Sequence, residues 1–67
     1  MLLKDLIKVL DVDSKILITE SGKDLFDGVV LSFYEGGDEQ GLKPESIEKE
    51  VKAIWYSTIY ARIMIEI

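Results

Sequence analysis

The C-terminal segment Val51–Ile67 limits what this chain can fold into more than any other part of it. The segment is dense in isoleucine, tyrosine and tryptophan, the β-branched and aromatic residues that favour strands. It is also apolar on more faces than a chain of 67 residues can easily cover. We therefore predict a C-terminal β-hairpin at the centre of the core, with apolar surface left over for a partner.

The size of the chain makes additional stabilisation desirable. A single domain of residues 1–67 buries only about 60% of the surface that its unfolded state exposes. The sequence has no cysteine and no histidine, which excludes disulfides, thiolate metal sites and the commonest nitrogen ligand. Among the usual ways of reinforcing a small fold, association with a partner remains. We expect a homo-oligomer.

Acidic residues are concentrated in one segment. Thirteen acids against eight bases give a formal net charge of −5, and most of the excess lies within residues 35–50. Such a field repels phosphate backbones, so direct nucleic-acid binding is not expected. The favoured interpretation is a solvated surface segment. The alternative is a nucleic-acid mimic that inhibits a basic host protein. The acidic surface would comprise Glu35, Asp38, Glu39, Glu45 and Glu48.

The first half of the chain has one helical and two extended patterns. Apolar residues recur at helical spacing over residues 3–10, which predicts an amphipathic helix. A β-rich run over residues 15–20 and a turn containing Gly22 predict a hairpin. Its second strand is expected to run over residues 25–34, with a bulge or bend at Gly28.

In the second half, a glycine-rich acidic loop precedes two further strands. Pro44–Glu48 has the composition of one helical turn, and the strands are expected at residues 50–56 and 58–67. Short connections favour an antiparallel meander. The predicted fold class is α+β, with the N-terminal helix packed on a strongly bent four-stranded antiparallel sheet. Whether that sheet closes into a barrel is left open.

The same order of patterns resembles a known group of proteins. After the helix and an acidic turn come Ile16-Leu-Ile-Thr19, Leu25-Phe-Asp-Gly28, Glu50-Val-Lys-Ala-Ile54 and the closing Ile63-Met-Ile-Glu-Ile67. This resembles very small proteins encoded by phages and prophages of Gram-positive bacteria, over nearly the whole chain. The resemblance implies an accessory protein with an α+β fold. It carries over no functional residue, because the loop of residues 36–41 and the long stretch Trp55–Tyr60 depart from the pattern.

Little in the sequence indicates catalysis or metal binding. Without histidine or cysteine the familiar nucleophile–base pairs cannot form, so we expect no enzyme and no cofactor. Asp11 and Asp13 resemble the start of a calcium loop, but Lys15 and Ile16 occupy the next required ligand and glycine positions. Weak binding of a divalent ion by the loop acids remains an alternative.

With no apolar run of membrane length and no secretory pattern, we expect a protein of the bacterial cytoplasm.

The aromatic residues of the C-terminal segment are the best candidates for a contact surface. We predict that Trp55 packs in the core, which would direct its neighbours Ile54 and Tyr56 to the other side of the strand. Aromatic residues combined with arginine are typical of interface anchors. The predicted partner-contacting residues are Ile54, Tyr56, Tyr60, Arg62 and Met64. The leading hypothesis is a non-catalytic phage or prophage accessory protein that acts through protein–protein contacts and self-associates.

Overall fold

Helix α1 (Leu3–Val9) forms where the apolar spacing predicts it. In the computed structural model, which describes residues 1–36 and 44–67, its buried side chains are Leu3, Leu6 and Ile7. No side chain caps the helix start. Instead, the first free backbone N–H, that of Leu3, donates to the carbonyl of Lys49 at 2.9 Å. The helix is therefore held by distant parts of the chain, as expected for an element too short to be stable alone.

Strands β1 (Lys15–Glu20) and β2 (Lys23–Val29) form the predicted hairpin. The two connecting residues, Ser21 and Gly22, both have positive φ, at 52° and 79°. Positive φ at both positions gives a turn whose twist matches that of the flanking strands. The turn containing Gly22 is thus confirmed.

The expected strand over residues 25–34 is wrong beyond Val29, because helix α2 (Val30–Gly36) begins there. Lys15, the first residue of β1, pairs with Val29. Residues after Val29 therefore have no residue of β1 opposite them. The N–H groups of Val30 and Leu31 donate instead to carbonyls of the preceding α1–β1 connection, each at 3.0 Å. The helix then buries Val30, and it places Phe33 edge-on against Phe26 with ring centroids 5.5 Å apart.

The irregularity expected at Gly28 lies elsewhere. The register between β1 and β2 shifts between Ile18 and Thr19, so that Leu25 is the extra residue. Gly28 pairs regularly with Ile16. Its lack of a side chain makes room for a ring, because a Cβ there would lie 3.3 Å from Cζ of Phe26. Gly28 therefore allows the Phe26 ring to pack against the backbone, and it does not form a bulge.

The remaining elements complete a mixed sheet. The 3-10 helix η2 (Pro44–Glu48) confirms the predicted single turn, and strands β3 (Ala53–Ser57) and β4 (Arg62–Glu66) form the C-terminal hairpin. The strand order is β2-β1-β4-β3, and β4 pairs with β1 in parallel. The expected meander is therefore wrong, and the sheet is neither closed nor strongly curled. The coarser prediction, an α+β fold with an N-terminal helix on a four-stranded sheet, is confirmed.

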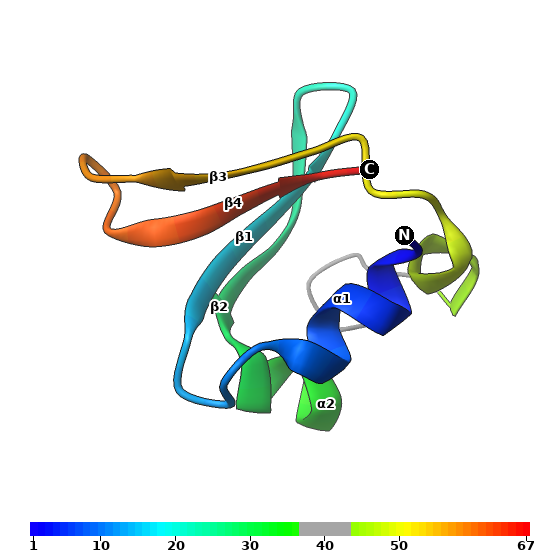
Figure 1. The fold of residues 1–67 in the computed structure, drawn as a ribbon, viewed down its shortest axis with the longest axis horizontal. Coiled ribbons are helices and arrows are strands. Elements are labelled where there is room, and N and C mark those ends of the chain that lie inside the picture. Colours follow the sequence, from blue (N-terminus) through cyan, green and yellow to red (C-terminus); the bar gives the residue numbers. More distant parts are fainter. Residues whose placement is uncertain (37–43) are drawn as a thin grey trace.

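The core lies between the helices and one face of the sheet (Figure 1). Both central strands supply it: Ile16 and Ile18 from β1, and Ile65 from β4, are all fully buried. The parallel pairing of β1 with β4 joins the N-terminal and C-terminal parts of the chain, since Ile16 lies opposite Ile63 and Ile18 opposite Ile65. In this view the β3–β4 hairpin extends away from α1 and α2. The helices therefore do not cover its far end.

Candidate contact surface

The strand register sorts the side chains of the sheet onto two faces. Paired residues share a face, so Ile54 and Tyr56 of β3 lie on the same face as Ile65 and Ile63 of β4. This is the helix-covered face. Trp55 pairs with Met64 and lies on the opposite face, which we call the open face.

The prediction that Trp55 packs in the core is wrong. Its side chain is on the open face and 48% exposed. Ile54 and Tyr56 have the direction of core residues, yet they are 49% and 61% exposed. Their strand is at the edge of the sheet and on the hairpin that extends away from the helices. Edge position therefore leaves Ile54 and Tyr56 uncovered on the helix-covered side, whereas Trp55 is exposed on the open face.

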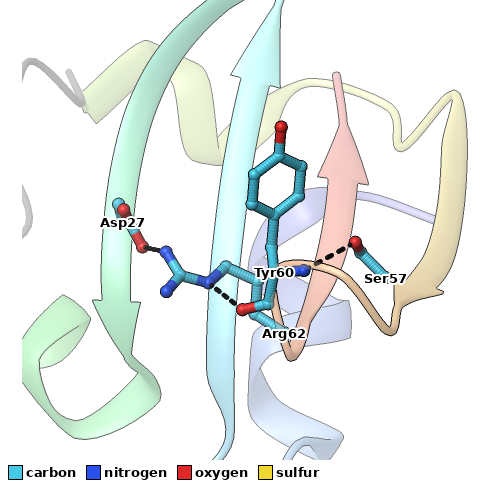
Figure 2. Close-up of polar contacts among 4 residues, drawn as sticks. All are labelled: Asp27, Ser57, Tyr60 and Arg62. Carbon is cyan, nitrogen blue, oxygen red and sulfur yellow. Dashed lines mark hydrogen bonds and ion pairs between the residues drawn. The ribbon is translucent and has the colours of Figure 1, made fainter.

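The turn between β3 and β4 exposes two further apolar side chains. Residues 58–61 form a four-residue connection in which Ala61 has a φ of 55°. The backbone N–H of Tyr60 donates to Oγ of Ser57 at 3.1 Å, which holds the turn together (Figure 2). Ile59 is 88% exposed and Tyr60 is 60% exposed. The expected strand over residues 58–67 is thus wrong in its first four residues, where the chain turns.

Arg62 fixes the base of the turn to the sheet. Its Nε donates to the carbonyl oxygen of Tyr60 at 3.0 Å, and its terminal guanidinium nitrogen pairs with the carboxylate of Asp27 (Figure 2). Because β1 lies between β4 and β2, the Arg62 side chain crosses the open face of β1 to reach Asp27. Arg62 and Met64 are both half-buried. These two predicted contact residues therefore lie half-buried on the open face, where Met64 is directly opposite Trp55.

Five large apolar side chains of the C-terminal hairpin are thus exposed, on both faces of β3 and in the β3–β4 turn. We call Ile54, Trp55, Tyr56, Ile59 and Tyr60 the hairpin patch; each is 48% exposed or more. A large aromatic side chain has about 150–250 Å² of surface, and an isoleucine has somewhat less. With about half or more of each side chain exposed, the five together leave on the order of 500 Å² in water. The largest contiguous apolar patch of a typical monomer is about 300–600 Å² and is often functional, and the total exposed here is of that size although it is divided between the two faces of β3 and the turn.

Sequence reasoning identified three of these residues and missed two. The sequence predicts Trp55 in the core, and it predicts Ile59 within the last strand, on the same face as Ile63 and Ile65. Thr58, Ile59 and Tyr60 favour strands by composition, so the sequence carries no clear signal for the turn of residues 58–61 that exposes Ile59. No sequence signal shows that β3 is an edge strand, because this depends on the parallel pairing of β1 with β4.

The predicted acidic surface is only partly described. Glu45 and Glu48 lie on η2, and Glu48 forms an ion pair with Lys4 at 3.0 Å. The backbone of Glu35 is in α2, whereas Asp38 and Glu39 lie outside the described residues. Two nearby acids are also paired: Glu50 with the terminal ammonium group at 2.9 Å, and Glu20 with Lys49. Part of the negative field is therefore compensated within the chain.

The described residues also line hollows away from the hairpin patch. One of about 380 Å³ has a mostly charged lining: Glu20, Lys23, Asp24, Leu25, Glu45, Ser46 and Lys49. A hollow of about 360 Å³ lies beside α1, lined by Lys4, Ile7, Lys8, Phe33 and Ile47. Among the acidic side chains that the structure describes, which exclude Glu35, Asp38 and Glu39, no three come together as a cation site needs. Among the side chains described, no buried polar atom lacks a hydrogen-bond partner. No described helix has the length and apolar character to span a membrane.

Comparison with known proteins leaves this surface as the main guide to function. No protein-family model, no curated protein and no solved structure matches the chain.

Proposed function

We propose that the chain is a non-catalytic accessory protein of phage or prophage type, which acts through protein–protein contacts and self-associates through the hairpin patch. The resemblance of the sequence pattern to small phage and prophage proteins supports the first part. The exposure of five large apolar side chains on one hairpin supports the second and is the observation that carries the proposal.

Energetics favour covering this surface. Moving apolar surface out of water contributes about 25 cal/mol per Å², and aromatic side chains dominate the energy of most interfaces. One side of a standard protein–protein interface buries about 800 Å², so a partner that contacts both faces of β3 and the turn would cover the hairpin patch within an interface of ordinary size. The half-buried Arg62 beside it matches the usual composition of an interface, in which arginine accompanies tyrosine and tryptophan.

The test is the mass of the purified protein by light scattering at micromolar concentration. The wild-type chain is expected to exceed the monomer mass of 7.6 kDa. The triple variant Ile54→Ser, Tyr56→Ser and Tyr60→Ser should remain folded and become monomeric. Truncation of one well-buried anchor typically costs about 2 kcal/mol of binding, roughly a thirtyfold change in the dissociation constant.

A matched control uses an exposed apolar residue away from the hairpin. Val9 is 72% exposed at the end of α1, and Val9→Ser should leave the mass unchanged. A wild-type chain that is folded and strictly monomeric at every concentration would contradict self-association. Equal weakening by Val9→Ser would contradict the assignment to the hairpin.

A further inference from the structure

The hairpin patch has a geometry that restricts how a partner can cover it. Ile54 and Tyr56 lie on the helix-covered face of β3, whereas Trp55 lies on the open face. All three side chains are about half exposed or more. A partner resting on one face of the sheet would reach only one of these two groups. A strand added to the free edge of β3 would lie beside both.

The edge of β3 is free and unprotected within the described residues. β3 is the last strand in the order β2-β1-β4-β3, so one side of its backbone has no sheet neighbour there. Its sequence, Ala53-Ile-Trp-Tyr-Ser57, contains no charge, no proline and no glycine. Natural proteins usually protect exposed edges with charges, prolines or bulges.

The opposite edge of the same sheet shows this protection. Strand β2 carries Lys23, Asp24 and Asp27, and the register shift at Leu25 interrupts its ladder. These are the features that discourage pairing with another strand. The contrast between the two edges indicates that β3 alone is suited to edge-to-edge contact.

We propose that two copies of the chain pair through their β3 strands, antiparallel and about a two-fold axis, to form one continuous eight-stranded sheet. This inference rests on the proposed function, because it specifies the partner and geometry of the same hairpin patch. Edge pairing of extended strands supplies main-chain hydrogen bonds, while the alternating side chains supply specificity. A two-fold contact requires a strand that is complementary to itself.

The register follows from the two faces. Residues opposite one another must share a face of the sheet. An even-numbered residue of one β3 strand can therefore pair only with an even-numbered residue of the other, and an odd-numbered residue only with an odd-numbered one. Among the allowed registers, only the one with Trp55 opposite Trp55 of the second copy pairs all five residues of β3. It places Ile54 opposite Tyr56 of the second copy, an aromatic and β-branched pair that stabilises sheets. It also places Ala53 opposite Ser57 of the second copy, and it brings no two like charges together within the strand.

A cysteine cross-link tests this register, since the natural chain has no cysteine. Directly opposed residues of antiparallel strands have Cα atoms about 4.5–5.5 Å apart, within the range of about 4.4–6.8 Å that a disulfide spans. The double variant Ala53→Cys and Ser57→Cys should form covalent dimers on oxidation. Each single variant should not, because identical positions would then be offset by four residues, about 13 Å along the strand. An equal mixture of the two single variants should form the mixed dimer only.

The outcomes separate this inference from the proposed function. Both substitutions are small and half-buried, and a circular dichroism spectrum like that of the wild type establishes that the fold persists. Covalent dimers of the double variant and of the mixture, with none from either single variant, support edge pairing. A reduced double variant of twice the monomer mass that gives no covalent dimer overturns the edge pairing but keeps self-association. Cross-linking by a single variant overturns the register, and a folded monomer at every concentration overturns both proposals.

Discussion

Phe26 and Gly28 show how a single residue decides the packing of the small core. The Phe26 ring is 1% exposed and lies edge-on against Phe33, while Cζ of the ring would be 3.3 Å from a Cβ on Gly28. The ring is thus confined between a neighbouring aromatic residue and the backbone of its own strand. The backbone angle does not favour glycine here, since φ is not in the left-handed region, so the close approach of the Phe26 ring is the reason for Gly28.

Gly28→Ala is therefore expected to destabilise the fold by overpacking, by about 1 kcal/mol. Urea unfolding followed by circular dichroism measures the loss. In a Phe26→Leu background the smaller side chain leaves room for the methyl group, so the cost of Gly28→Ala should fall. An unchanged cost in that background would show that the contact with the ring is not the cause.

The ion pair between Arg62 and Asp27 is expected to contribute little to stability. The Asp27 side chain is 51% exposed, and exposed pairs are typically worth about 0–1 kcal/mol. Asp27→Asn should therefore lower the free energy of unfolding by less than about 1 kcal/mol, and the difference should shrink at high salt. A larger, salt-independent loss in urea unfolding would contradict a solvated pair.

At the scale of elements, the sequence predicted what local chemistry determines. The helix around Leu6 and the turn at Gly22 depend on neighbouring residues, and both form as expected. The helix after Val29 and the parallel pairing of β1 with β4 depend on long-range geometry. The residues from Val30 favour a strand by their composition, but no neighbouring strand is available there. The exposure of Trp55 follows from the same long-range pairing, so local patterns could not predict it.

The last strand offers a direct comparison between a core and a surface isoleucine. Ile65 lies on a central strand and is fully buried, whereas Ile59, in the preceding turn, is 88% exposed. Ile65→Ala should cost about 2–5 kcal/mol, a large part of the stability of a domain this small. Ile59→Ala should leave the free energy of unfolding within about 0.5 kcal/mol of the wild type.

Circular dichroism of both variants in urea measures this difference. The measurement is made on dilute protein, because Ile59 belongs to the hairpin patch and self-association would add to the apparent stability. Similar costs for the two substitutions would mean that the β3–β4 turn packs on other parts of the same chain.

For the whole molecule, net charge and apolar contact act in opposite directions. Two copies with a net charge of −5 each repel one another, while the proposed contact through β3 carries no charge. Added salt screens the repulsion, with a screening length of about 10 Å at 0.1 M and 3 Å at 1 M. Self-association is therefore expected to strengthen as salt rises, as measured by sedimentation equilibrium.

The acidic-mimic alternative predicts the reverse for a complex with a basic protein, which salt should weaken steeply. Neutralising Asp38, Glu39, Glu45 and Glu48 should abolish that complex and leave self-association intact. Self-association that weakens with salt would contradict a contact dominated by apolar side chains.

The fluorescence of Trp55 tests most directly whether a second copy covers the hairpin patch. The chain has one tryptophan, and it lies at the proposed axis with 48% of its surface exposed in the single chain. As the concentration rises through the micromolar range, the emission maximum should move to shorter wavelength in step with the increase in mass. Val9→Ser should reproduce this change, and the triple hairpin variant should not. An emission maximum that stays constant while the mass doubles would contradict a contact through the hairpin.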